Sequence, residues 1–132
     1  MKKMLLKRNQ KGFTLIEIIA VLIILGILAA VAIPKYFDMQ DEAKNKALDG
    51  ALAEGVGRIN NYFGQRALSG DAPSAIAYDN TNLGTDAGDF TLAYSGGAAG
   101  ASTDIVVTAT GTTTGAGFTT SKTKTVKRPG TD

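Results

Sequence analysis

The chain has 132 residues, which is room for one small folded unit and hardly for a second independent core. It contains neither cysteine nor histidine, which excludes disulfides, thiolate metal sites, cysteine nucleophiles and imidazole bases. A metal ion would have to bind to oxygen ligands, which favours calcium or magnesium over zinc. No nucleophile, phosphate-binding loop or paired carboxylates stand out, so the sequence predicts neither an enzyme nor a bound cofactor.

The formal net charge of +2 is distributed unevenly along the chain. All 12 acidic residues follow position 12 together with only nine of the 14 basic residues, so the net charge beyond that position is −3 (9 − 12). The other basic residues form a short leader and are Lys2, Lys3, Lys7, Arg8 and Lys11. The bulk charge therefore gives no support to nucleic-acid binding, and we expect no nucleic-acid partner.

A long apolar segment follows the basic leader. From Phe13 to Ile33 the sequence reads FTLIEIIAVLIILGILAAVAI, and Glu17 is the only charged residue in this stretch. About 20 such residues cross the hydrocarbon core of a bilayer as a helix. Because positive charge stays on the cytoplasmic side of a membrane, we expect the leader inside the cell and the rest of the chain exported.

Two ordinary interpretations of this segment remain open from its composition. A secretory signal peptide would be cut after Ala32, because Ala30-Val31-Ala32 places small residues around the cleavage site. A plain signal anchor would instead stay in the membrane. Neither interpretation explains Glu17, because an acidic side chain inside hydrocarbon costs roughly 2.5–3.5 kcal/mol and usually marks a functional site.

The residues around Glu17 resemble a known export signal. The stretch KGFTLIE at 11–17, followed by the apolar run and Pro34, resembles the type III signal of type IV pilins and of type II secretion pseudopilins. The resemblance implies that a prepilin peptidase cleaves between Gly12 and Phe13 on the cytoplasmic side. It also implies that the same enzyme methylates the new amine of Phe13.

In that family the acidic residue at the position of Glu17 serves subunit assembly. Cleavage before Phe13 creates a positively charged amine, and the Glu17 carboxylate of a neighbouring subunit is a natural partner for it in a dry bundle of helices. Removing one partner of a buried pair typically costs about 3–5 kcal/mol, so the pair would fix the stagger between subunits. Small residues would help the helices to pack closely, namely Ala20, Gly26, Ala29, Ala30 and Ala32.

The resemblance implies a structural subunit of a type IV pilus or pilus-like filament. Such a subunit is made as a single-pass inner-membrane precursor, and inner-membrane machinery assembles it into a helical homo-oligomer outside the cell. A type II secretion pseudopilin, which would form a periplasmic pseudopilus, is the alternative within the family. A membrane-anchored protein for DNA uptake or adhesion is the alternative from another class.

The helical pattern continues beyond the apolar segment, with Gly26 and Pro34 as the two points where we expect a kink. Over residues 35–68 apolar residues recur at intervals of three and four and predict an amphipathic helix. Its apolar face comprises Ala47, Leu48, Ala51, Leu52, Val56, Ile59 and Phe63. Four glycines each weaken an isolated helix by roughly 0.8–1.0 kcal/mol, so we expect this helix to need a packing partner. They are Gly50, Gly55, Gly57 and Gly64.

The remaining residues predict a loop followed by a small sheet. Residues 69–89 are rich in turn formers, and strands are expected at 90–94, 103–110 and 118–127, with a turn at 111–117. The predicted fold class is α+β and pilin-like. One long N-terminal helix, hydrophobic in its first half, is expected to pack on a small antiparallel β-sheet. The expected domains are a cleaved leader (1–12), a membrane and filament-core helix (13–34), its amphipathic continuation (35–68) and the loop and sheet (69–132).

Three further groups of residues are candidate sites, each with an ordinary alternative. Calcium would find oxygen ligands in Asp71, Asp79, Asp86, Asp89, Asn80 and Asn82. These residue types also form turns, and their spacing matches no EF-hand. A basic tail could touch DNA or protect an edge strand from aggregation, and it consists of Lys122, Lys124, Lys127 and Arg128. Aromatic residues could stack between subunits or simply pack, namely Phe13, Tyr36, Phe37, Tyr62 and Phe63.

Overall fold

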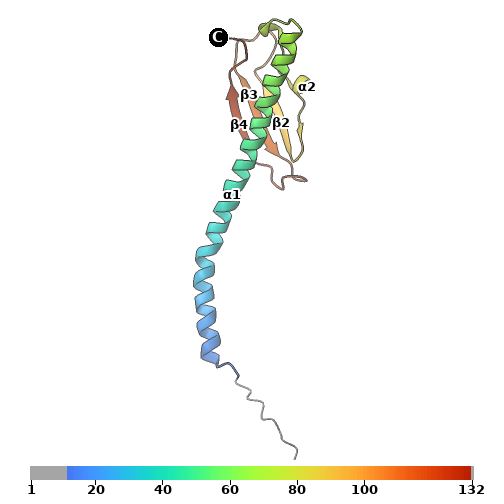
Figure 1. Ribbon diagram of the computed structural model, residues 1–132. Coiled ribbons are helices and arrows are strands. Elements are labelled where there is room, and N and C mark those ends of the chain that lie inside the picture. Colours follow the sequence, from blue (N-terminus) through green and yellow to red (C-terminus); the bar gives the residue numbers. More distant parts are fainter. Residues whose placement is uncertain (1–11, 132) are drawn as a thin grey trace, which may run out of the picture. The chain divides into compact units, whose positions relative to one another are not determined.

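The computed structural model describes residues 12–131 of the chain (Figure 1). A helix of 54 residues, α1 (Leu15–Leu68), is followed by a single 3-10 turn (Pro73–Ala75) and a short helix, α2 (Asn80–Leu83). Four strands follow, which are β1 (Asp86–Ala87), β2 (Phe90–Ser95), β3 (Ile105–Gly111) and β4 (Ser121–Val126). This order of one long helix and a small sheet confirms the predicted α+β class.

Contacts divide the chain into two units, one ending at Gln40 and the other beginning at Asp41. In the first unit every described residue is exposed, including the large apolar side chains of α1. This helix is long and apolar enough to cross a membrane. It continues through Gly26 and Pro34, so the kinks expected at these two residues remain predictions.

The sheet of the second unit has the order β1-β2-β3-β4, and every neighbouring pair is antiparallel. Each strand therefore follows its neighbour in the chain, as in a simple meander. The register places Leu92 opposite Ala109 and Val107 opposite Lys124. Successive side chains of a strand point to opposite faces of the sheet. Alternate residues of β3 are therefore buried, while those between them are half-buried.

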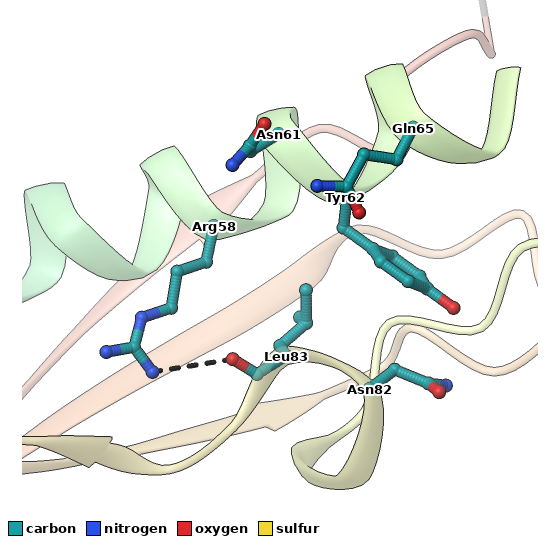
Figure 2. A pocket seen from close by; sticks show the side chains of 6 residues that line it. All are labelled: Arg58, Asn61, Tyr62, Gln65, Asn82 and Leu83. Atoms are coloured by element: carbon teal, nitrogen blue, oxygen red, sulfur yellow. Dashed lines mark hydrogen bonds between the residues drawn. The ribbon is translucent and has the colours of Figure 1, made fainter. Parts of the chain in front are cut away.

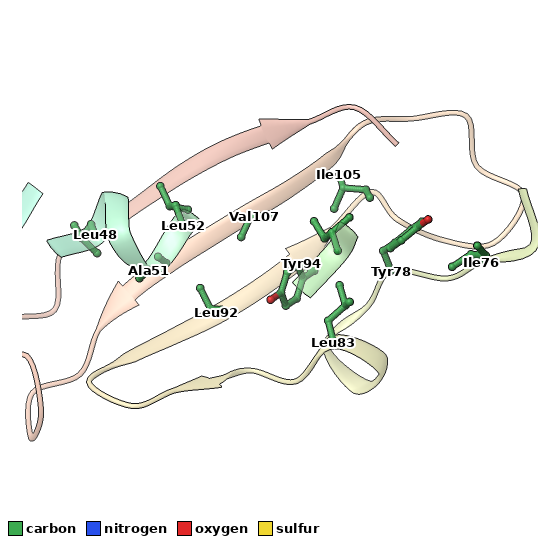
Figure 3. Packing of buried hydrophobic residues seen from close by; sticks show 12 residues of the cluster. Leu48, Ala51, Leu52, Ile76, Tyr78, Leu83, Leu92, Tyr94, Ile105 and Val107 are labelled. Carbon is green, nitrogen blue, oxygen red and sulfur yellow. The ribbon is translucent and has the colours of Figure 1, made fainter. Parts of the chain in front are cut away.

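The core lies between the sheet and the part of α1 that belongs to the second unit (Figure 3). On the helix, the buried residues recur at intervals of three and four, and they are Leu48, Ala51, Leu52, Gly55 and Ile59. Most of the predicted apolar face is thus confirmed. The sheet contributes one face of β2 and β3, with Leu92, Tyr94, Ile105, Val107 and Ala109 all buried.

Gly55 is buried because α1 and β3 approach one another closely there. A Cβ atom at this position would lie 2.7 Å from Cγ1 of Val107, which is too close for two carbon atoms. The sequence pattern alone makes this glycine a weak point of the helix. The structure gives it a use, because the missing side chain lets Val107 pack directly against the helix backbone.

The segment predicted as a plain loop at 69–89 contains three short elements, which are the 3-10 turn at Pro73–Ala75, α2 and β1. Asp79 starts α2, since its Oδ1 accepts hydrogen bonds from the backbone N–H groups of Thr81 (3.0 Å) and Asn82 (2.9 Å). Asn80 Oδ1 accepts from the backbone N–H of Tyr94 at 2.7 Å and ties the same turn to β2. Elements of two to four residues are too short to leave a periodic sequence pattern.

We predict that Gly55→Ala lowers the melting temperature of the full chain in detergent, followed by circular dichroism. Overpacking of this kind typically costs about 1–3 kcal/mol, which exceeds the gain in helix propensity of about 1 kcal/mol. Gly57→Ala is the matched control, because a Cβ at Gly57 meets nothing within 4 Å. It should raise the melting temperature. Equal responses to the two substitutions would contradict the close approach at Gly55.

Candidate assembly site

The first turn of α1 carries a reciprocal pair of hydrogen bonds between Thr14 and Glu17. The backbone N–H of Thr14 donates to Oε2 of Glu17 at 2.7 Å, and the backbone N–H of Glu17 faces Oγ1 of Thr14 at 3.4 Å. This is a capping box, in which a threonine before the helix and a glutamate three residues later satisfy free backbone donors. The signature T-x-x-E of a capping box is visible in the sequence at 14–17, where only Glu17 stands out by its charge.

The capping box explains how a carboxylate is tolerated at the start of an apolar helix. The N-terminus of a helix carries a partial positive charge, which stabilises an acidic side chain in the first turn. A carboxylate has about four lone-pair positions, so accepting one hydrogen bond from Thr14 leaves room for further donors. Glu17 is thus held by its own helix and is still able to accept from another molecule.

Gly12 and Phe13 precede the first helical residue and are both exposed. A Cβ atom at Gly12 would meet nothing within 4 Å, and the Phe13 side chain is 85% exposed. The peptide bond between them is therefore accessible and free of helical structure. The rest of the predicted leader, residues 1–11, lies outside the described part of the chain.

The side chains beyond Glu17 form a continuous apolar surface. Leu22, Ile27 and Val31, for example, are 61%, 63% and 72% exposed. Soluble monomers rarely expose an apolar patch of more than a few hundred Å², so this surface marks contact with a membrane or with other proteins. Glu17 is the only charged side chain of this apolar segment and lies at its N-terminal end. It is therefore the one charged group there that can form a specific polar contact.

Comparison with known proteins addresses this same segment. Residues 7–33 match the family model described as the prokaryotic N-terminal methylation motif. The N-terminal segment is of the prepilin type. The motif spans the expected cleavage and methylation position, Glu17 and the whole apolar run.

Relatives of the chain include both pilins and a secretion protein. It is 52% identical over 83 residues to a type IV major fimbrial protein FimA of Dichelobacter nodosus, covering 60% of this chain and 50% of the relative. It is 46% identical over 43 residues to the type IV narrow pilus major component PilA5 of Thermus thermophilus, covering 33% and 37%. It is 41% identical over 56 residues to the type II secretion system core protein G of Pseudomonas aeruginosa, covering 42% and 39%.

These matches cover no more than half of each of these relatives. No solved structure gives a significant match to the chain. The relationship to type IV pilins and to the secretion protein therefore rests on sequence, and it is supported by the long apolar helix and the four-stranded antiparallel sheet.

Three of the four acidic residues proposed as calcium ligands serve the local structure of the loop. Asp79 caps α2, Asp86 Oδ1 accepts from the backbone N–H of Gly88 at 2.9 Å, and Asp71 pairs with Arg66 at 2.7 Å. Among residues 12–131, no three acidic side chains gather into a group suited to a metal ion. The turn chemistry considered as the alternative accounts for these three residues.

The basic C-terminal tail does not form one exposed patch. Lys122 Nζ lies 2.6 Å from Oδ1 of Asp49 on α1, and Arg128 is buried. Only Lys124 and Lys127 of this group remain exposed without an ion pair among the described residues. Two separated lysines are a weak basis for binding nucleic acid.

Of the aromatic residues considered for stacking, Tyr36 and Phe37 are exposed and contact each other edge to face, with ring centroids 6.4 Å apart. Phe13 is exposed and lies before the helix. Tyr62 packs edge to face on Tyr78 with centroids 6.2 Å apart. Tyr62 and Phe63 thus belong to the packing of the second unit, as the ordinary alternative states.

A small polar hollow lies beside Arg58 on α1 (Figure 2). It has a volume of about 160 Å³ and is lined by Arg58, Asn61, Tyr62, Gln65, Asn82 and Leu83. The Arg58 guanidinium donates to the carbonyl oxygens of Gly84 at 3.1 Å and Asp86 at 2.6 Å, and the Glu54 carboxylate raises the pKa of Arg58. The guanidinium is therefore occupied in tying α1 to the segment between α2 and β1.

We predict a small pH-dependent contribution to stability from Asp49. The hydrogen bond from Lys122 lowers the pKa of Asp49, so its stabilisation is present above the unfolded-state pKa of about 3.9 and is lost as the pH falls through the lower folded value. Asp49→Asn should be slightly less stable than the parent at neutral pH and equal to it in strong acid, by thermal unfolding. The difference is small because both side chains are partly exposed.

The control for this measurement is Glu42→Gln, which removes an exposed carboxylate that has no ion pair among residues 12–131. It should not reproduce the change. A stability difference for Asp49→Asn that is the same at every pH would contradict the role of the Asp49–Lys122 pair.

Proposed function

We propose that the chain is a structural subunit of a type IV pilus or pilus-like filament, which inserts into the inner membrane and then assembles through its apolar helix. The observation that carries this proposal is the prepilin-type segment, in which an exposed apolar helix begins at a single capped carboxylate behind an accessible Gly12–Phe13 bond. Before assembly the apolar side chains are covered by lipid. In the filament the helices of other copies would cover them.

The geometry of the first turn supports a mechanism for joining subunits. Processing converts Phe13 into a chain terminus with a positive amine, next to Thr14. In the single chain the carboxylate of Glu17 accepts from the Thr14 N–H. Because the carboxylate has spare acceptor positions, the amine of an incoming subunit adds to the capping box without displacing it. The first turn would thus stay helical while the new subunit binds.

The relatives favour a pilus subunit over a secretion pseudopilin. The match to the FimA protein is longer and closer, at 52% identity over 83 residues, than the match to the secretion protein G, at 41% over 56 residues. Both matches are longer than the apolar segment. The pseudopilin remains the second candidate, because relatives of both kinds match this chain. A pilus subunit would be located in an extracellular filament. A pseudopilin would be located in a periplasmic pseudopilus.

We predict that a prepilin peptidase cleaves between Gly12 and Phe13 and methylates the new amine of Phe13. Mass spectrometry of the N-terminal peptide of the mature protein, isolated from cells, should show N-methylated phenylalanine at its start. Gly12→Val should leave the leader attached, because a branched side chain would crowd the bond that the peptidase must bind. A mature terminus at Ile33 would instead identify an ordinary signal peptide.

We predict that Glu17→Ala and Glu17→Gln both abolish or strongly reduce filament assembly. The glutamine variant separates the two uses of Glu17, because an amide oxygen still caps the helix while the negative charge is gone. Both variants should accumulate normally in the membrane, since losing the charge makes insertion easier. The measurements are the abundance of the variant in the membrane fraction and the amount of filament recovered, each relative to the parent.

The outcomes distinguish pairing from capping. Filament from the glutamine variant but not from the alanine variant would show that capping is the essential role of Glu17. Normal filament from both variants would contradict any role for this carboxylate in assembly.

A further inference from the structure

Arg128 is the single buried charged residue among residues 12–131, with only 2% of its surface exposed. Lysine, arginine and carboxylate side chains are almost never fully buried in proteins unless they are paired. Arg128 takes part in none of the ion pairs formed within this part of the chain. Its described polar partners are backbone carbonyl oxygens, and these come from two other segments.

The guanidinium of Arg128 connects the C-terminal tail to both segments at once. Nη1 donates to the carbonyl oxygen of Ala98 at 3.0 Å, in the loop between β2 and β3. Nη2 donates to the carbonyl oxygen of Ile76 and lies 3.4 Å from those of Pro73 and Ser74. The planar fork of an arginine suits several acceptors at fixed angles, which the single ammonium of a lysine does not.

The same two segments are also joined by backbone hydrogen bonds next to Arg128. Tyr78 N–H donates to the Gly97 carbonyl oxygen at 2.8 Å, and Gly100 N–H donates to the Ser74 carbonyl oxygen at 2.6 Å. The guanidinium carbon lies 5.1 Å from the centre of the Tyr78 ring, within the range of a cation–π interaction. Arg128 thus sits over the junction where the segment after α1 meets the loop after β2.

The tail remains packed beyond Arg128. Oγ1 of Thr131 donates to the Arg128 carbonyl oxygen at 2.8 Å. Gly130 has a φ of +77°, and a Cβ atom there would lie 2.9 Å from Pro73 and 3.1 Å from the Phe63 ring. Only glycine fits this conformation and this spacing without strain. Gly130 therefore packs against Pro73 after the buried cation.

We propose that residues 128–131 form a strap, locked by Arg128, that closes the second unit without a covalent bond. The segment between α1 and β1 has only two short helical turns of its own, so it needs anchoring from outside. In a chain without cysteine, the strap supplies that anchor. This proposal does not depend on the proposed function, because it rests only on contacts within the second unit.

The chemistry of the strap gives it two properties. Arginine stays charged at every pH at which proteins fold, and its polar partners among residues 12–131 are neutral carbonyl groups, so we expect the strap to be insensitive to pH. It is also insensitive to salt, because the guanidinium is buried and salt screens buried groups much less than exposed ones.

The test is hydrogen exchange of the full chain in detergent micelles, measured at the amides of Tyr78 and Gly100. Arg128→Met keeps the length and apolar stem of the side chain and removes the guanidinium, and Lys127→Met is the matched control next to it. We expect exchange at both amides to become roughly 10- to 100-fold faster in Arg128→Met, because bonds to a charged group are lost. Leu92 and Val107 amides in the sheet should change far less, and Lys127→Met should change neither pair.

Gly130→Ala provides an independent test that keeps the charge and disturbs only the tail. It should accelerate the same two amides while the sheet remains protected, so the proposal is testable even if Arg128→Met folds poorly. In the parent, the protection of Tyr78 and Gly100 should be the same at low and high salt. The proposal is overturned if Arg128→Met and Gly130→Ala exchange like the control, if sheet and junction amides accelerate equally, or if salt removes the protection.

Discussion

The close packing of α1 on the sheet is the constraint on which the second unit depends. Val107 occupies the place where a side chain at position 55 would otherwise lie, so helix and strand can approach only at a glycine. This contact also fixes the register of the sheet, because a slip by one residue would turn Leu92 and Val107 away from the helix. The elements that close the unit are then positioned around a helix and a strand that have only one way to pack.

The first unit follows a different rule, because its described residues bury none of their apolar side chains against one another. A helix satisfies its own backbone hydrogen bonds and is therefore stable in lipid without partners. Moving such a helix from lipid into a bundle of helices changes the surroundings of its apolar side chains only a little. In the proposed filament, specific geometry would then come from the polar groups, which in this segment are those of the capping box of Thr14 and Glu17.

Charged residues of the second unit connect elements that are distant in the sequence. Arg58 holds the segment after α2, Lys122 pairs β4 with α1, and Arg128 closes the junction beneath the C-terminal tail. Each of these cations has a role within the fold. Such connections matter most in a small unit, whose apolar core alone contributes limited stability.

The sequence by itself determined the features that depend on neighbours in the chain: the apolar run, the amphipathic continuation, three of the four strands, and Glu17 in its motif. These features depend on periodicity and on capping residues that lie within a few positions of one another, so they can be predicted from the sequence alone. The tertiary structure alone decided the use of Gly55 and the burial of Arg128. The partners of these residues lie far away in the sequence, at Val107 on β3 and at Ile76 before α2. The residues next to Gly55 and Arg128 in the sequence do not show whether a distant strand or carbonyl group will contact them. Only folding brings those groups together.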